Sequence, residues 1–428
     1  IMLADDVLKE PVLGFNPRQN ITKEDILAIL ERHLSERIND KVSKGKKIKI
    51  IISIAAISFI QGLQYCVSPV LGQIQEHYPD VNISLVQMLI TAPALLSMIV
   101  AVLSGWLVLK ISKKKLLLFA SLVAGITGFL PYLSDSFGLL FFSRTFYGVG
   151  LGLATALNTA VVAEFFEGDE RVSVMGIQAA SVGAGMVVVT TVGGMLGAGG
   201  FKNAYLINVI GFISLILIAC CLPDTGKAQA SGSEKIQLNK EVFKISFLGM
   251  LEFLFLITFT TNIAMHLSGN LAGNTAVSGN LTGVFSGSQI VIGLILGMVT
   301  KITKKYTLPV AMLSFSIGGL LLILFPSNLI MLMAGAVFCG FSQGIFIPQA
   351  MVDVAGAVKP VATAMASACF TCAMCFGQVI SPTVLNTISK LVFGEVSTTN
   401  VYIISVIGMT VVAVITIIMK MKKGKYIK

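Results

Sequence analysis

The sequence contains Lys110-Ile-Ser-Lys-Lys114 and, 191 residues later, the similar stretch Lys301-Ile-Thr-Lys-Lys305. A second pair of stretches aligns at an offset of 192, namely Phe146-Tyr-Gly-Val-Gly-Leu-Gly152 and Phe338-Cys-Gly-Phe-Ser-Gln-Gly344. Two separate matches at nearly one offset indicate that a large structural unit occurs twice in this chain.

The composition of the chain is typical of an integral membrane protein. Of the 428 residues, 55% are hydrophobic and 12% are charged, and the mean hydropathy is +0.87. A soluble domain carries about 25% charged residues, so a soluble protein of this composition could not cover its surface. Only helices and closed barrels span a bilayer, and continuous apolar runs of about twenty residues favour helices over alternating barrel strands.

The apolar runs predict an all-α membrane protein of twelve transmembrane helices in two six-helix halves, preceded by a short amphipathic helix. The spans are expected at residues 49–73, 84–108, 115–133, 137–163, 174–197, 203–222, 245–268, 280–300, 307–325, 329–350, 361–387 and 400–419. The domain boundaries follow from these spans. They give an N-terminal extension at 1–45, a first half at 46–222, a linker at 223–243 and a second half with a basic tail at 244–428.

The N-terminal extension is polar, with an amphipathic helix expected at residues 22–38. Thr22 and Asp25 form a capping-box-like start, and the apolar residues that follow share one face of a helix. Two interpretations stay open: a helix that lies on the membrane domain or at the lipid interface, and a helix that docks a partner or gates the protein.

The lysines and arginines predict the orientation, because loops on the cytoplasmic side carry an excess of them. With the N-terminus inside, 23 of these residues fall in inner segments from residue 41 onward, whereas Lys202 and Lys390 alone fall in outer loops. One missed or extra span would invert every later loop and remove this bias. Both termini are therefore expected in the cytoplasm.

An even number of spans per repeat gives the two halves the same orientation, and parallel repeats are an architecture of transporters with a central site. The stretch from Gly105 to Lys114 resembles the loop motif G-x-L-x-D-R-x-G-R-K of the major facilitator superfamily, with Leu109 in place of the aspartate. Arg144 and the three glycines that follow it resemble that family's fourth-span motif R-x-x-x-G-x-G-x-G. Gly377-Gln-Val-Ile-Ser-Pro382 resembles segments of bacterial drug-efflux-type members.

This resemblance implies a multi-pass protein of the bacterial cytoplasmic (inner) membrane, and it implies gating or structural roles for the residues that match the motifs. These residues are Gly105, Lys110, Lys113, Lys114, Gly148, Gly150, Gly152 and Pro382.

Ionisable side chains inside the spans are few, and such residues are costly to bury and mark functional sites. Arg144 lies in the fourth span, Glu252 in the seventh and His266 near the end of the seventh. Glu252 is a candidate proton site, because a carboxylate inside a span can bind and release a proton when its surroundings change. Arg144 is a candidate for proton coupling or substrate contact, or a structural arginine bonded to helix carbonyls. His266 is a weaker coupling candidate, since a lone histidine near an interface is usually a satisfied polar residue.

The remaining polar residues of the spans are neutral and could line a substrate cavity together with Arg144, although each could instead bond one helix to another. These candidate substrate-binding residues are Gln61, Gln64, Tyr65, Asn158, Asn262, Gln343, Gln349 and Gln378.

These features favour a secondary active transporter that exports a small amphipathic compound by alternating access, with a proton as the coupling ion. The alternatives are uptake or exchange of an organic anion steered by Arg144, and then a transporter-like sensor or a channel. No enzyme activity, cofactor, metal site or nucleic-acid partner is predicted, and Cys369, Cys372 and Cys375 are interpreted as residues of a continuous helix. The expected partners are substrate and lipid, and the expected state is a monomer.

Overall fold

The computed structural model describes residues 44–133, 135–166, 168–227, 239–358 and 363–425, and within these ranges every regular element is a helix. The amphipathic helix expected at 22–38 lies outside the described residues. Ile51–Lys428 forms one unit by its internal contacts, and the packing below refers to its described residues.

The first set of helices begins with the candidate span Lys44–His77, which includes η1 and α3. Its elements are η1 (Leu63–Val70), α3 (Leu71–His77), α4 (Ile83–Leu107), α5 (Lys113–Leu133), α6 (Phe137–Phe165), α7 (Gly168–Gly197), α8 (Phe201–Ala204), η2 (Tyr205–Asn208) and α9 (Val209–Cys221).

The second set begins with the helix that carries Glu252. Its elements are α10 (Lys240–Leu256), α11 (Thr258–His266), η3 (Gly269–Leu271), α12 (Thr275–Leu294), α13 (Leu296–Thr303), η4 (Lys304–Tyr306), α14 (Thr307–Leu324), α15 (Leu329–Gly356), α16 (Thr363–Phe393) and α17 (Thr398–Lys425).

Eleven helices of the described residues are long and apolar enough to span a membrane, one fewer than the sequence predicts. The difference arises at the expected span 280–300, which is broken at Ile295 between α12 and α13. One candidate span, Leu296–Leu324, combines α13, η4 and α14, and α12 is not among the eleven. The physical reason is that α12 is unusually polar for a membrane helix, with the side chains of Thr275, Ser278, Asn280, Thr282, Ser286, Ser288 and Gln289.

Short polar side chains fix where several of these helices begin. An asparagine or serine lies at the N-cap and accepts a hydrogen bond from a main-chain N–H of the first turn, which is the preferred way to satisfy such a group. These capping residues are Asn82, Ser136, Asn239, Asn274 and Asn328. These caps mark the points along the chain where one loop ends and the next apolar helix begins.

Glycines bring pairs of helices into main-chain contact, as they do in membrane helix packing. A Cβ at Gly148 or Gly152 of α6 would collide with the main chain of α4, at the carbonyls of Pro93 and Ser97. The aligned glycines of α15 make the same contact with α12, where Gly340 meets Phe285 and Gly344 meets Gln289. Both the glycines and the residues that they meet are offset by 192, so the repeat seen in the sequence is also a repeat of contacts.

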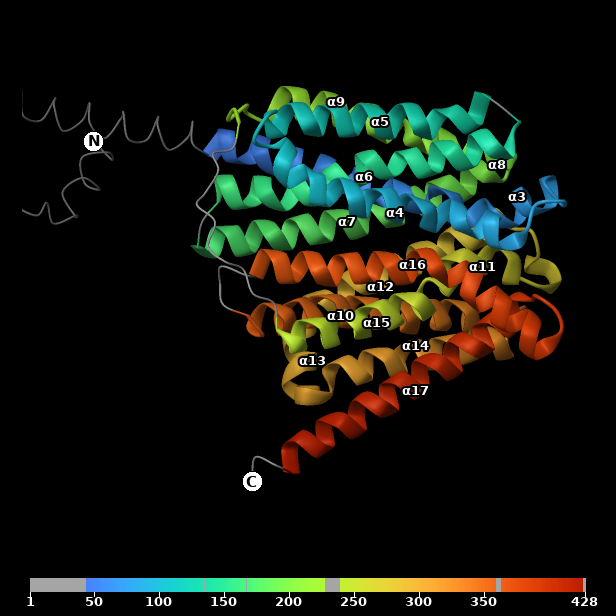
Figure 1. Ribbon diagram of the computed structural model, residues 1–428. Coiled ribbons are helices and arrows are strands. Elements are labelled where there is room, and N and C mark those ends of the chain that lie inside the picture. The colour runs from blue at the N-terminus through green and yellow to red at the C-terminus, as the bar shows by residue number, and fades with distance from the viewer. Residues whose placement is uncertain (1–43, 134, 167, 228–238, 359–362, 426–428) are drawn as a thin grey trace, which may run out of the picture. The chain divides into compact units, whose positions relative to one another are not determined.

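The order of helix neighbours repeats as well. Helix α6 packs on α4 and α5, and α15 packs on α12 and α14 in the same way. Helix α9 then packs on α5 as α17 packs on α14. Helices α4 to α9 gather along one side of Figure 1 and α10 to α17 along the other, and the two sets meet where α7 packs on α12 and α4 packs on α16.

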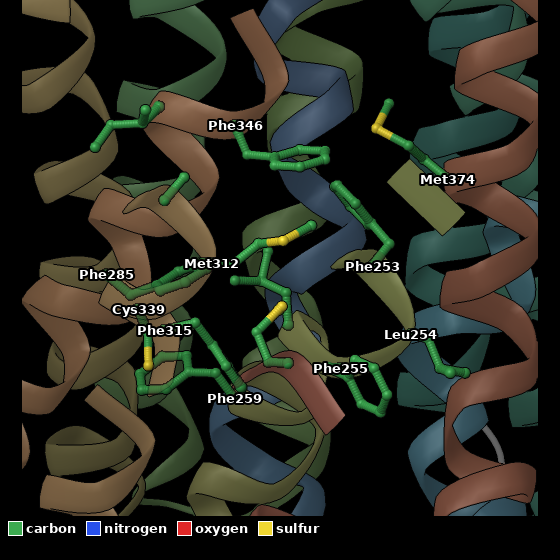
Figure 2. Packing of buried hydrophobic residues seen from close by; sticks show 14 of the residues in the cluster. Phe253, Leu254, Phe255, Phe259, Phe285, Met312, Phe315, Cys339, Phe346 and Met374 are labelled. Carbon is green, nitrogen blue, oxygen red and sulfur yellow. The ribbon is translucent and has the colours of Figure 1, made fainter. Parts of the chain in front are cut away.

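The buried apolar core of the second set consists largely of phenylalanine, methionine and aliphatic side chains. Phe259 and Phe285 stack with ring centroids 4.7 Å apart, beside Phe315 and Met312 (Figure 2). Phe253 points toward Phe346 of α15 in the same view. Helix α10 contributes Phe253 and Phe255 to this aromatic cluster, immediately after Glu252.

Candidate functional site

Glu252 is a fully buried acid in the middle of the second set of helices, with 0% of its side chain exposed. One carboxyl oxygen, Oε1, accepts a hydrogen bond of 2.8 Å from the hydroxyl of Ser342 on α15. The other, Oε2, is buried with no hydrogen-bond partner in the described part of the chain. An ionised carboxylate here would lack a counter-charge, and a proton is the smallest group that supplies one.

The surroundings of Glu252 are held by close helix packing. On α10, Gly249 lies against the ring of Phe370, and Gly377 of α16 lies against the main chain at Met250. Ser381, next to Pro382 in α16, donates a 2.6 Å hydrogen bond to the carbonyl of Leu254. A proton site on α10 would thus be tied to the movement of α15 and α16.

Arg144 is also fully buried, and its guanidinium is surrounded by main-chain oxygens. Its Nη2 donates to the carbonyl of Gln64 at 2.5 Å, and its Nε donates to the carbonyl of Leu89 at 3.2 Å. Its Nη1 donates to the thiol of Cys66 at 3.6 Å, and the group lies 5.0 Å from the ring centroid of Tyr147. Every nitrogen of the guanidinium is therefore engaged with helix groups, which is the structural interpretation that the sequence leaves open.

His266 has partners on both ring nitrogens. Nδ1 lies 2.9 Å from the hydroxyl of Thr398, and Nε2 lies 3.0 Å from the carbonyl of Leu322. Its ring meets Tyr402 edge to face at 4.7 Å. These contacts tie α11 to α14 and α17 and are those of a satisfied polar residue.

A network of amide side chains joins the two sets of helices. The Gln87 amide of α4 donates 2.8 Å to Oδ1 of Asn262 on α11, and Gln87 Oε1 accepts a 2.7 Å bond from Asn386 of α16. The Asn386 amide also donates 2.9 Å to the hydroxyl of Ser84. Of these four residues, Asn262 alone is predicted from the sequence as a candidate substrate residue. An amide within a predicted span would have been the signal for Gln87 and Asn386.

More contacts between the two sets lie at the same end of the bundle, which carries the loops predicted to be outside. Ser68 of η1 donates 2.6 Å to the carbonyl of Thr260, and Thr275 of α12 donates 2.9 Å to the carbonyl of Gly194 on α7. Gly194 and Gly279 face each other there without side chains. The described hydrogen bonds between the sets thus hold together the predicted outer end.

The other candidate substrate residues divide between helix contacts and unpaired amides. Gln64 donates to the carbonyl of Ile90, Asn158 donates to Ser58, and Gln343 accepts from Gln289. Gln349 donates to Asp353 one turn along α15. The remaining three residues, Gln61, Gln378 and Tyr65, are buried or half-buried. The side-chain amide nitrogens of Gln61 and Gln378 have no hydrogen-bond partner in the described residues.

The loop motif after α4 makes contacts with neighbouring helices. Lys113 forms a 2.8 Å ion pair with Glu164 of α6, and Lys114 donates to the carbonyl of Ala219 on α9. Lys110 lies 4.3 Å from the ring centroid of Trp106, whereas Gly105 has open space where a Cβ would stand. The glycines of α6 are packing residues, and Gly150 meets the carbonyl of Ala120 on α5.

Comparison with known proteins gives one curated relative over part of the chain. The riboflavin transporter RibZ of Clostridioides difficile (strain 630) is 29% identical over 145 residues, which are 33% of this chain and 32% of that protein. The match therefore spans about a third of the length of this relative.

Solved structures with the same fold cover most of the chain. A mutant of the nucleoside transporter NupG has a TM-score of 0.72 at 14% identity, covering 86% of this chain and 99% of that one. A POT family transporter in complex with 5-aminolevulinic acid has a TM-score of 0.70 at 12% identity, covering 89% and 96%. A bacterial homolog of the human lysosomal transporter Spinster, in an inward-facing and unoccupied conformation, has a TM-score of 0.64 at 12% identity, covering 87% and 95%.

The family model of the Major Facilitator Superfamily matches residues 50–267 and again residues 245–426. Together with the helical fold, these matches show that the chain belongs to the Major Facilitator Superfamily and is a multi-pass membrane protein for secondary transport, not an enzyme.

Proposed function

We propose that this transporter is coupled to protons and exports small amphipathic organic compounds, with Glu252 as its proton site. The observation that carries the proposal is the buried carboxyl of Glu252, which has one oxygen on Ser342 and one without a partner. No ion pair of Glu252 occurs among the described residues. Protonation of this group would remove a buried charge, so its proton occupancy would favour one arrangement of α10 and α15 over another.

The proposed architecture is twelve spans in two parallel halves, with the broken pair α12 and α13 as the eighth span. The matching glycine contacts of α6 with α4 and of α15 with α12 support it. This architecture also explains why α12 is polar, because α12 packs on α7 of the other half. A helix buried between protein neighbours needs less apolar surface than one that faces lipid.

The proposed state is closed at the predicted outer end, and both termini are on the cytoplasmic side of a bacterial inner membrane. The amide network of Gln87, Asn262 and Asn386 would then act as a latch between the halves. Breaking a few neutral hydrogen bonds costs little, which suits a contact that opens in every transport cycle. The excess of lysine in the predicted inner segments supports this orientation.

The proposed substrate class is small, amphipathic and uncharged or weakly charged. The buried amides that lack partners, on Gln61 and Gln378, offer hydrogen bonds without charge. The aromatic and methionine side chains of the core that α10 shares with its neighbouring helices offer adaptable apolar contacts (Figure 2). The partial likeness to a riboflavin transporter makes riboflavin the first compound to test.

Transport of an organic anion steered by Arg144 is the alternative, and the contacts of Arg144 argue against it. The guanidinium already donates to two carbonyls and a thiol, so an anion could bind it only after these bonds break. A sensor role would rest on the N-terminal extension, of which the structure describes only Lys44 and Gly45.

The test is a direct measurement of proton movement with the purified protein in vesicles that hold a pH-sensitive dye. The substrate is the compound that raises the melting temperature most in a screen that includes riboflavin, since binding stabilises the folded state. We expect a substrate gradient to move protons in the opposite direction across the vesicle membrane. Substrate flux with no proton movement would rule out proton coupling, and flux with co-directional protons would rule out exchange and hence export driven by proton entry.

A further inference from the structure

A cavity of about 410 Å³ lies at the predicted inner end, away from Glu252 and Arg144. It forms where the loop between α4 and α5 meets the segment that follows α9. Its walls are made by Lys110, Ile111, Ser112, Lys115, Asp224, Gly226 and Lys227. Nothing in the transport mechanism proposed above uses this cavity.

The charge of the cavity is unbalanced toward the positive side. Three lysines and one aspartate line it, which leaves a net charge of +2 (three minus one). Asp224 accepts hydrogen bonds from the main-chain N–H of Gly226 at 3.1 Å and from Ser112 at 3.2 Å. These two bonds lower the pKa of Asp224, so its carboxylate is ionised and already engaged. The three ammonium groups form no ion pair within the described residues and are available to an anion.

An apolar track leads away from the cavity on the lipid-facing side. On α5, Lys115 is followed at helical spacing by three exposed side chains on the same face, Phe119, Leu122 and Ile126. Trp106 of α4 is 55% exposed beside Lys110. Tryptophan in membrane proteins gathers at the level of the lipid headgroups, which places the cavity at that depth.

We propose that this cavity binds the headgroup of an anionic phospholipid. The phosphate would lie among Lys110, Lys115 and Lys227, and an acyl chain would follow the apolar face of α5. Basic pockets at the cytoplasmic side of membrane helices are suited to such headgroups. A soluble phosphate compound would satisfy the lysines but not the apolar track, so a lipid fits both features.

Trp106 is the single tryptophan of the chain, so its fluorescence reports on this site directly. The experiment places the full chain in phosphatidylcholine vesicles and adds phosphatidylglycerol that carries bromine on its acyl chains, because bromine quenches nearby tryptophan. We expect brominated phosphatidylglycerol to quench Trp106 at a lower mole fraction than brominated phosphatidylcholine does. Replacing Lys115→Gln and Lys227→Gln together should weaken this preference about tenfold or more.

Two variants sharpen the result. The pair Lys301→Gln and Lys305→Gln lies in the corresponding loop of the second half and should leave the preference unchanged. Asp224→Asn keeps Oδ1 for the Gly226 N–H and places an amide NH2 where Oδ2 accepted from Ser112, so that this NH2 can donate to the Ser112 hydroxyl. The variant removes the negative charge, so it should strengthen the preference for phosphatidylglycerol. Equal quenching by both lipids in the unaltered protein would overturn the proposal, as would an equal loss in the control pair. Displacement of the lipid by millimolar glycerol phosphate would show that a soluble phosphate, not a lipid, is the ligand.

Discussion

At the scale of single residues, a buried charge is stable in lipid only when neighbouring groups satisfy it. Arg144 meets this condition with two carbonyls, a thiol and an aromatic ring. Its aligned position in the second half is Ala336, so this arrangement has no counterpart at the matching position. The first half thus contains a buried arginine, and the second half contains a buried acid, Glu252.

Replacing Arg144 tests whether it holds structure or binds substrate. We expect Arg144→Ala to destabilise the fold by roughly 2–4 kcal/mol, because it removes the guanidinium donors from the carbonyls of Gln64 and Leu89 inside the bundle. Arg144→Lys should fall between, since a lysine keeps the charge but not the fork of donors. Thermal unfolding in detergent measures both. An Arg144→Ala protein with unchanged melting temperature and lost substrate binding would favour the organic-anion alternative instead.

At this scale the sequence indicates which residues are exceptional in a membrane span but not which residues they contact. The cost of burying charge in lipid is enough to single out Arg144 and Glu252. The partners of an amide depend on how distant helices align, and an amide can bond its own helix, its neighbour or water equally well. The hydrogen bond between Gln87 and Asn386 was therefore not predicted, because it joins residues that are 299 positions apart in the sequence.

At the scale of helices, the repeated glycine contacts lead to a matched set of substitutions. Gly148→Ala and Gly340→Ala should each destabilise the protein by about 1–3 kcal/mol, because the added methyl group has to displace the main chain of the facing helix. Gly105→Ala is the control, since a Cβ there meets nothing within 4 Å. Melting temperatures of the three variants measure the effect. Equal melting temperatures for Gly148→Ala and Gly105→Ala would contradict the close approach of α6 and α4.

The bounds of the helices were predictable from the sequence where contact with lipid determines the composition of the helix. Helices α4, α5 and α6 begin and end within two residues of the expected spans, because apolar runs and capping residues both mark these ends. The prediction of one continuous helix at 280–300 was wrong, since α12 ends at Leu294 and a separate helix, α13, begins at Leu296. Helix α12 packs on α7 and α15, so neighbouring helices rather than lipid set its composition, and a hydropathy pattern cannot foresee this.

At the scale of the whole molecule, the proposal of alternating access requires the predicted outer end to open. Ser84 and Asn386 come from different halves and lie within hydrogen-bond distance at that end. With Ser84→Cys and Asn386→Cys together, a short thiol-reactive cross-linker should block transport, and reductant should restore it. Each single variant is the control for reaction with native cysteines. Full transport by a protein shown to be cross-linked would mean that this contact stays closed during the cycle.

The most direct test of proton coupling through Glu252 compares two kinds of flux in vesicles that contain the Glu252→Gln protein. Glutamine keeps the shape and the bond to Ser342 but cannot gain or lose a proton. We predict that transport driven by a pH gradient falls to the level of empty vesicles, whereas exchange of labelled for unlabelled substrate without a gradient continues. Unchanged pH-driven transport in the Glu252→Gln protein would contradict the account.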